Sequence, residues 1–383
     1  MAKTIVFCAD GTWNGPNRDD DGDSVPDVTN VFKLFVGLSG MPSAESILAA
    51  DEQEKALVAG GETIQVAKYI HGVGDSRNPI IRLMGGAFGS GIIARVVRGY
   101  TFISRNYEDG DAIVIVGFSR GAYTARALGG LIVSQGVLKP SLTTDKTEAY
   151  RSGAQAWYRY RKLASAVRPG FFERLVEATA DLPAFLSRQE LGDADFVAVA
   201  KLKAVAVWDT VGALGLPLYI KDARADAFKF TDTHLSAKVE NGFHAIALDE
   251  QRKDFTPTLW DAAGNVTQVA FPGAHADVGG GYTTNNSESG LSDIALGWMV
   301  TQLAGVGVAF GEPIFTPLAP DPAATAHKPW RHPPFDVPGA TALRQLSGNS
   351  IVEHPAVQQR IDAGPLVQEP GEGISIYAPL NRP

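Results

Sequence analysis

The sequence predicts an α/β fold with a largely parallel sheet, and two observations support this prediction. Short apolar segments rich in Val and Ile recur along the chain, each ended by Gly, Asp or Pro, as is typical of buried parallel strands. Helical patterns lie between them, and alternation of strand and helix places helices on both faces of the sheet. The expected strands are residues 4–9, 63–70, 112–118, 203–208 and 266–271.

Helical patterns occupy the intervals between the expected strands. Residues 85–107 precede the third strand and residues 120–138 follow it. Before the fourth strand, residues 147–167 and 170–191 also have helical patterns. In 170–191 the apolar side chains fall on roughly one face, which favours packing on the core, with a cap over an active site or a lipid-contacting helix as the alternative. These apolar side chains are Phe171, Leu175, Val176, Leu182, Phe185 and Leu186.

The spacing of these elements predicts one domain over residues 1–383 with two additions. The long interval between the third and fourth strands predicts a helical cap or insertion at 140–200. Residues 310–383 are rich in Pro and are expected to form a mostly irregular C-terminal segment over the domain.

Composition and charge argue against several classes of partner. The chain has 383 residues, 45% of them hydrophobic, and a net charge of −8, which disfavours nucleic acid and simple electrostatic docking on anionic lipid. The one cysteine, Cys8, cannot form an internal disulfide. The first apolar run is too short for a signal peptide, and no stretch is long enough for a membrane span. We therefore expect a cytoplasmic protein, with export by a signal-independent secretion system left open.

Residues 117–121 carry the most specific motif in the chain, G-x-S-x-G. The motif follows an apolar strand directly and precedes a helix directly, which is the context that a nucleophile elbow requires. Such a sharp turn strains the Ser119 backbone, and Gly117 and Gly121 avoid Cβ atoms that would collide with the neighbouring strand and helix. The helix start also places the Arg120 amide to bind a developing oxyanion. The sequence thus predicts an α/β-hydrolase fold with Ser119 as nucleophile.

A serine nucleophile needs a base and an orienting acid. His275 lies just past an apolar strand in a Gly-rich stretch after Ser119, as the Ser, acid, His order of this fold expects, although it could be a loop histidine bonded to backbone. Asp209 follows the strand between them and would hold the imidazole in the useful tautomer. Many α/β hydrolases instead carry the acid one strand later than Asp209. Asp277 is a rival acid, but it is better placed to accept hydrogen bonds from the amides of its own loop.

The remaining candidates have weaker contexts. The second oxyanion donor should come from the loop after an early strand, where Gly11 and Thr12 follow the first strand, although an Asp-Gly turn that merely ends the strand is nearly as well supported. Among the other histidines, His244 is expected in a helix and His327 in the irregular C-terminal segment.

No metal or cofactor is expected. The acidic segment 17–27 carries Asn17, Asp19, Asp21 and Gly22 at the first positions of a calcium loop, but Val28 replaces the bidentate Glu, which favours a solvated acidic loop. The Gly-rich segment 85–91 lacks the Gly-Lys-Ser/Thr of a phosphate-binding loop.

Five motifs in the order VFCADGTWNG, VGFSRGAYTARALGGLI, VWDTVGALGLP, DEQRKDFTPTLW and FPGAHADVGGGY carry a family resemblance. Over roughly residues 3–300 the chain resembles the bacterial and fungal α/β-hydrolase domain family that includes type VI secretion phospholipase effectors. The resemblance implies a triad of Ser119, Asp209 and His275 and activity on phospholipid esters.

The expected function is cleavage of carboxylic ester bonds by a phospholipase-like or lipase-like serine hydrolase. The expected partner is a small-molecule or lipid ester, with peripheral membrane contact and no nucleic acid. Two alternatives stay open: a non-catalytic binding protein that retains the fold, and an esterase, thioesterase or polyester depolymerase acting on non-lipid substrates.

Overall fold

A nine-stranded sheet forms the centre of the protein in the computed structural model, which describes residues 2–11, 19, 22, 24–43, 52–72, 88–165, 191–211, 233–311, 318–348 and 350–383. The strand order is β11-β10-β9-β8-β5-β1-β4-β3-β2. All neighbouring strands from β11 to β4 are parallel, and β3 and β2 extend the sheet as antiparallel strands. The strands are β1 (Thr4–Ala9), β2 (Met41–Pro42), β3 (Glu52–Ala59), β4 (Glu62–Ile70), β5 (Ala112–Phe118), β8 (Ala204–Trp208), β9 (Gly242–Ala247), β10 (Val266–Phe271) and β11 (Ile351–Glu353).

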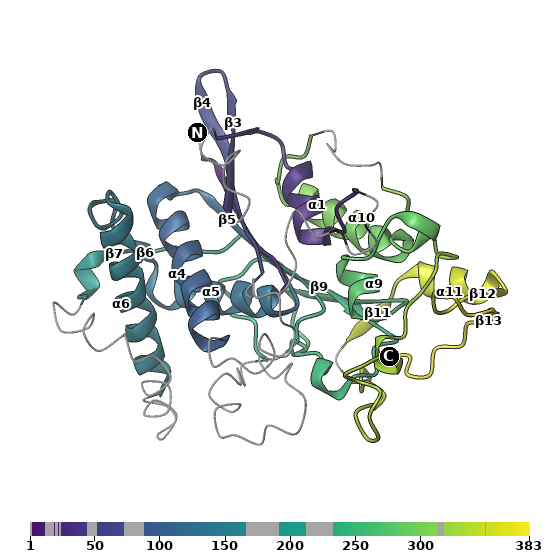
Figure 1. Cartoon of the computed structure of the whole chain (residues 1–383). Coiled ribbons are helices and arrows are strands. Elements are labelled where there is room, and N and C mark those ends of the chain that lie inside the picture. The colour runs from purple at the N-terminus through teal and green to yellow at the C-terminus, as the bar shows by residue number, and fades with distance from the viewer. Residues whose placement is uncertain are drawn as a thin grey trace.

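Helices cover both faces of this sheet, so the chain has an α/β fold. In Figure 1, α4, α5 and α6 lie on one side of the sheet and α1, α9 and α10 on the other. The helices are α1 (Asn30–Gly37), α4 (Phe88–Asn106), α5 (Arg120–Gln135), α6 (Lys146–Ser165), α9 (His275–Gly279), α10 (Gly290–Gly305) and α11 (Pro355–Asp362). Two small antiparallel pairs lie outside the main sheet, β6 (Val137–Leu138) with β7 (Phe196–Val197) and β12 (Pro365–Val367) with β13 (Ile374–Ile376).

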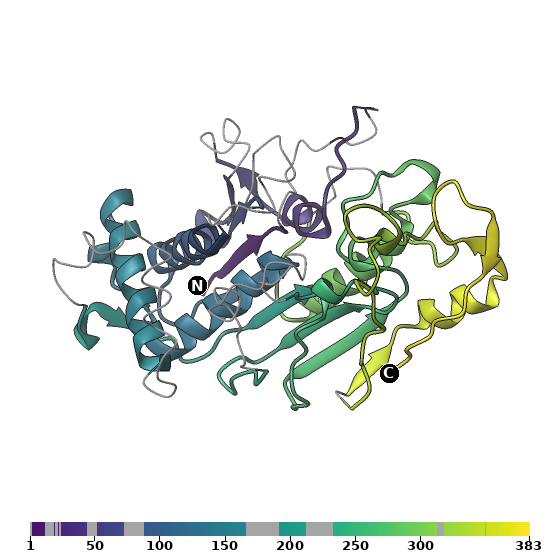
Figure 2. The same cartoon turned by 60° about the horizontal axis from the view of Figure 1, so that its bottom comes forward.

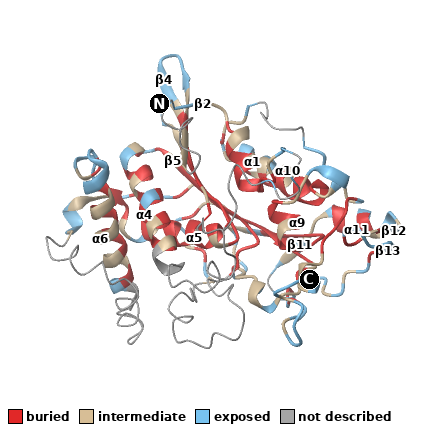
Figure 3. Cartoon of the chain, in the orientation of Figure 1, coloured by how far each residue is buried: buried red, intermediate tan, exposed pale blue. Residues whose placement is uncertain are grey.

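The core consists of two apolar layers separated by the sheet. Successive side chains of a strand point to opposite faces, so Ile5 and Phe7 of β1 pack with α4 and α5, while Val6 and Cys8 pack with α1 and α10. The central strands β1, β5, β8 and β9 are accordingly buried, and in Figure 3 exposed residues gather at the β3–β4 hairpin and on the outer helix faces.

The five strands predicted from sequence correspond to β1, β4, β5, β8 and β10 to within one residue at each end. Three of the predicted helices correspond to α4, α5 and α6. The fourth, over 170–191, lies almost entirely outside the described residues, and so do its apolar side chains.

The expectation that His244 lies in a helix is wrong, because it lies in β9 between β8 and β10. The segment GFHAIA contains few β-branched residues, so its pattern does not favour a strand. His244 is fully buried, accepts a hydrogen bond from the Thr210 amide at 3.2 Å, and packs against Trp260. Burial lowers the pKa of His244 to about 3, so the ring stays neutral.

The two additions to the domain differ in what they cover. In the segment 140–200, α6 packs beside α4 and α5: Gly153 faces Val97 and Thr101, and Tyr160 lies against Gly130. The segment 310–383 has little regular structure but supplies β11 to the main sheet beside β10. In Figure 2 it lies at the end of the sheet beyond β10.

No helix in the described part of the chain is long and apolar enough to cross a membrane.

Candidate active site

Ser119 occupies a strained turn between a strand and a helix. It follows β5 directly and precedes α5 directly, with φ of 56° and ψ of −122°. Positive φ is uncommon for a residue with a Cβ atom and is found where the surrounding structure enforces it. Here the Ser119 amide donates to the Trp208 carbonyl at 3.2 Å, which ties the turn to the neighbouring strand β8.

The two glycines of the motif allow the turn to close. A Cβ atom on Gly117 would lie 2.3 Å from the Gly121 carbonyl oxygen, and one on Gly121 would lie 2.1 Å from the Ala9 carbonyl oxygen. Real Cβ atoms do not approach backbone so closely. The helix α5 can therefore pack against the end of β1 only with glycine at position 121.

We expect Gly121→Ala to lower the free energy of unfolding by about 3 kcal/mol, because the methyl group must displace the backbone of β1. Gly297→Ala is the matched control, since Gly297 lies within α10 and its added Cβ would meet no atom within 4 Å. That control should raise stability by up to about 1 kcal/mol. Urea denaturation measures both, and equal effects would contradict the steric account.

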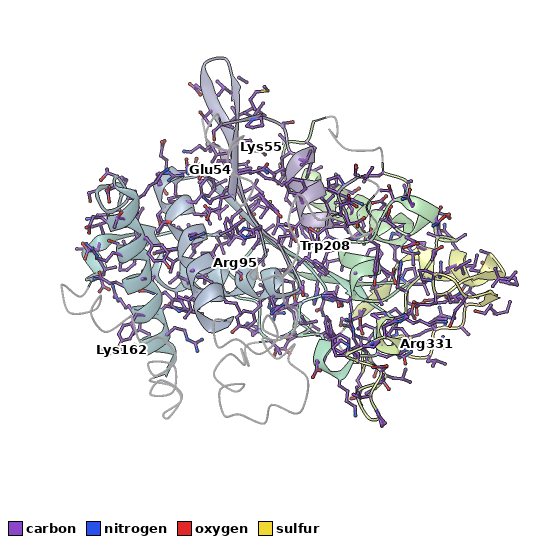
Figure 4. The ribbon with its side chains drawn as sticks, viewed as in Figure 1. Glu54, Lys55, Arg95, Lys162, Trp208 and Arg331 are labelled. Carbon is purple, nitrogen blue, oxygen red and sulfur yellow. The ribbon has the colours of Figure 1, made fainter. Side chains whose placement is uncertain are left out.

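Asp209 lies at the same sheet edge as Ser119. Phe118 of β5 pairs with Trp208 of β8, so the residues that follow these two lie side by side beyond the strand ends. Trp208 lies near the middle of the molecule, between Arg95 on α4 and Arg331 in the C-terminal segment (Figure 4). Asp209 is fully buried and also has a positive φ, 35°. Both residues thus leave their strands through strained backbone.

His275 bonds Asp209 through its ring. His275 is the first residue of α9, just after β10, and its Nδ1 lies 2.6 Å from Asp209 Oδ2. Since the carboxylate accepts, Nδ1 carries the proton and Nε2 is left as the basic nitrogen. The structure thus places a hydrogen-bonded pair of carboxylate and imidazole at this edge of the sheet.

Aromatic rings and a second acid fix the position of His275. Its ring centroid lies 4.6 Å from that of Phe118, the residue before Ser119, and 4.9 Å from that of Phe255. Its backbone amide donates to Glu250 Oε2 at 3.2 Å, and Glu250 also pairs with Arg252 through both carboxylate oxygens. Burial lowers the pKa of His275, opposed by the hydrogen bond to Asp209.

Arg344 is a site residue that the sequence analysis missed. Its guanidinium pairs with both oxygens of Asp209, at 2.6 and 2.9 Å. Burial alone would raise the pKa of Asp209, but Arg344 and the hydrogen bond from His275 outweigh it and hold the pKa well below its usual range. The sequence context of Arg344, a Pro-rich segment without a helix or strand pattern, does not indicate that this arginine is buried.

The rival acids are engaged elsewhere. Asp277 accepts from the Ala274 amide at 2.8 Å, as expected of a loop-capping residue, and its other oxygen lies 2.6 Å from His327 Nδ1. Asp249, one strand later than Asp209, accepts from the Gly273 amide and the Tyr377 hydroxyl. The ring of His275 therefore bonds neither of them.

The proposed oxyanion donors are only partly described. The Arg120 amide opens α5 directly after Ser119. The Gly11 amide donates to the carboxylate of its neighbour Asp10 at 2.6 Å, which fits a turn that ends β1. Thr12 lies outside the described residues. Burial raises the pKa of Asp10 to about 6, although Tyr69 and Thr29 donate hydrogen bonds to it.

The acidic segment after β1 makes local hydrogen bonds where it is described. Asp19 accepts from the amides of Gly22 and Ser24 at 2.7 and 3.0 Å. Asn17 and Asp21 lie outside the described residues. Within the described ranges, no group of three or more His, Cys, Asp or Glu residues could hold a metal ion.

A mostly parallel sheet, a strained serine between strand and helix, and an acid–histidine pair at the same edge define an α/β protein with a polar site at the carboxyl edge of its sheet. The chain belongs to the family described as "T6SS, Phospholipase effector Tle1-like, catalytic domain", whose model matches residues 3–302. The resemblance predicted from the five motifs is thereby confirmed.

Individual relatives are more distant. An uncharacterised protein of Saccharomyces cerevisiae is 26% identical over 66% of this chain, which spans 32% of that protein's length. Two solved structures are similar. An uncharacterised protein from Pseudomonas aeruginosa has a TM-score of 0.42 and 17% identity, and the match covers 83% of this chain and 48% of that one. The Tle1 effector bound to the VgrG spike from the Type 6 secretion system has a TM-score of 0.39 and 16% identity, and the match covers 74% of this chain and 52% of that one. The chain thus spans from a third to about half of these relatives.

Proposed function

We propose that this protein is a serine ester hydrolase with an α/β-hydrolase fold, in which Ser119 is the nucleophile, His275 the general base and Asp209 the orienting acid. The observation that carries the proposal is the 2.6 Å hydrogen bond between His275 and Asp209 at the edge where the strained Ser119 turn lies. The ring contact between Phe118 and His275 supports a Ser119 hydroxyl within reach of His275 Nε2.

The reaction proceeds in two halves. His275 Nε2 takes the Ser119 proton, the alkoxide attacks the ester carbonyl, and His275 then returns the proton to the departing alcohol. Water, deprotonated by the same nitrogen, attacks the acyl-enzyme, and His275 returns that proton to the departing Ser119 oxygen as the acid is released. The Arg120 amide at the positive end of α5 stabilises the tetrahedral oxyanion. The Thr12 amide is the candidate second donor, because the Ala9 and Asp10 carbonyls that precede it lie against Gly121.

We propose phospholipid acyl esters as the substrate class, on the basis of family membership. Such a substrate implies peripheral contact with a membrane surface. Residues 140–200, whose described α-helix is α6, are the proposed cap beside the acyl pocket. Export by a type VI secretion system is likewise a proposal from the family.

Product analysis tests this function. The protein is incubated with mixed-chain phospholipid vesicles and, separately, with p-nitrophenyl esters of increasing chain length. Free fatty acid and lysophospholipid, together with a chain-length optimum, support a phospholipase. Turnover of short esters alone would redirect the proposal to a non-lipid esterase, and no turnover of any ester would favour a binding protein.

The pH dependence of kcat/KM should report the titration of His275. The base is active when neutral, and burial lowers its pKa below the ordinary value of about 6.5. Activity is therefore expected to rise with pH through a midpoint below 6.5 and to be constant near neutrality. Initial rates from pH 4 to 8 measure this limb, and a midpoint above 7 would contradict the assignment.

A further inference from the structure

We propose that Arg344 is a positioning residue of this site, which holds the Asp209 carboxylate charged and oriented toward His275. The inference rests on the proposed function and deepens it. Arg344 lies beyond residues 3–302, the part of the chain that matches the family model. The C-terminal segment would then complete the catalytic site as well as extend the sheet.

Both oxygens of the Asp209 carboxylate accept hydrogen bonds from identified donors. Oδ1 accepts from Arg344 Nη1 at 2.6 Å and from the Ala247 amide at 2.9 Å. Oδ2 accepts from Arg344 Nη2 at 2.9 Å and bonds His275 Nδ1 at 2.6 Å. A two-point pair of this kind fixes the plane of the carboxylate. Rotation of Asp209 away from His275 would break bonds to three residues.

Arg344 is itself held in place. Its Nη1 also donates to the Ala247 carbonyl at 2.7 Å, and its Nη2 donates to the Phe255 carbonyl at 2.6 Å. The ring of Phe255 contacts the ring of His275, so one guanidinium bonds both the acid and the backbone of a residue that packs against the base. The Lys253 amide donates a hydrogen bond to the Ala340 carbonyl, and the Ala342 amide donates one to the Gln251 carbonyl. These two bonds anchor the chain just before Arg344.

Charge gives Arg344 an effect that packing alone would not have. In the described part of the chain, the charged or titratable groups around His275 and Asp209 include Arg344 from the C-terminal segment, Glu250 and Arg252 after β9, and His244 within β9. Glu250 and Arg252 pair with each other, and His244 is neutral, so among the described residues Arg344 is the cation that pairs with Asp209. A buried cation beside the acid disfavours protonation of the histidine bonded to that acid.

The test compares Arg344→Met, Arg344→Lys and the control Arg382→Met, whose side chain is exposed in the same segment and pairs with Glu353. Each variant is measured by the pH profile of kcat/KM and by NMR titration of the His275 imidazole, which needs no substrate. For Arg344→Met we expect both midpoints to rise by about one pH unit and kcat to fall about 10-fold to 100-fold. Arg382→Met should match the wild type.

Arg344→Lys retains the charge but loses the two-point geometry. We expect its titration midpoint near that of the wild type and its kcat about 10-fold lower. If Arg344→Met does not fold, this variant decides, because an unchanged kcat would overturn the inference. A folded Arg344→Met protein with an unshifted His275 titration would overturn it as well. Absence of Ser119-dependent turnover in the wild type would instead contradict the proposed function.

Discussion

Ser119→Ala is expected to lower kcat for ester hydrolysis by about 10⁴-fold or more, because the covalent acyl intermediate can no longer form. The variant should remain folded, since alanine occupies the same positive-φ position and the strain at φ of 56° is already present in the native turn. Initial rates with the best p-nitrophenyl ester measure the loss, and thermal unfolding measures the stability.

Ser134→Ala is the matched control for this experiment. Ser134 lies near the end of the same helix, α5, and is exposed. Its substitution should leave both the rate and the midpoint of thermal unfolding unchanged. A Ser119→Ala protein that retained more than about a tenth of the wild-type rate would show that another group performs the chemistry.

Asp209→Asn is expected to have the second largest effect, a fall in kcat of about 10⁴-fold. The asparagine amide can donate a hydrogen bond to His275 Nδ1. The ring proton would then lie on Nε2, and Nε2 could not accept the proton of the serine hydroxyl. The substitution also leaves the Arg344 guanidinium buried without its carboxylate partner. We therefore expect the free energy of unfolding to fall by about 3 to 5 kcal/mol.

A double variant separates these two consequences. Asp209→Asn combined with Arg344→Met removes both charges and should recover part of the lost stability without recovering activity. Asp362→Asn is the control, because Asp362 is an exposed carboxylate at the end of α11. Urea denaturation and ester turnover are measured for all variants. Wild-type turnover by Asp209→Asn would exclude this carboxylate as the acid.

The parts of the fold that the sequence predicts are those specified by local pattern. β5 is a continuous apolar strand buried on both faces, and the Gly-x-Ser-x-Gly turn after it requires glycine for steric reasons that act within the turn and its immediate neighbours. Local pattern also predicts the strand ends at Trp208 and Phe271, and these ends place Asp209 and His275 at one sheet edge.

The parts that the sequence does not predict depend on contacts between distant segments. β9 is a strand because β8 and β10 supply its hydrogen bonds and bury both of its faces, although its own residues have modest strand preference. Arg344 reaches Asp209 across 135 positions in sequence, from a segment without a helix or strand pattern. An isolated arginine in a Pro-rich segment gives no local sign of such a partner.

Covalent labelling with a fluorophosphonate probe tests the central claim most directly, because the probe reacts only with a serine that is activated by its surroundings. Intact-protein and peptide mass spectrometry should find one adduct in the wild type, on Ser119, and none in Ser119→Ala. Equal labelling of the two proteins, or an adduct on a different residue, would contradict the account.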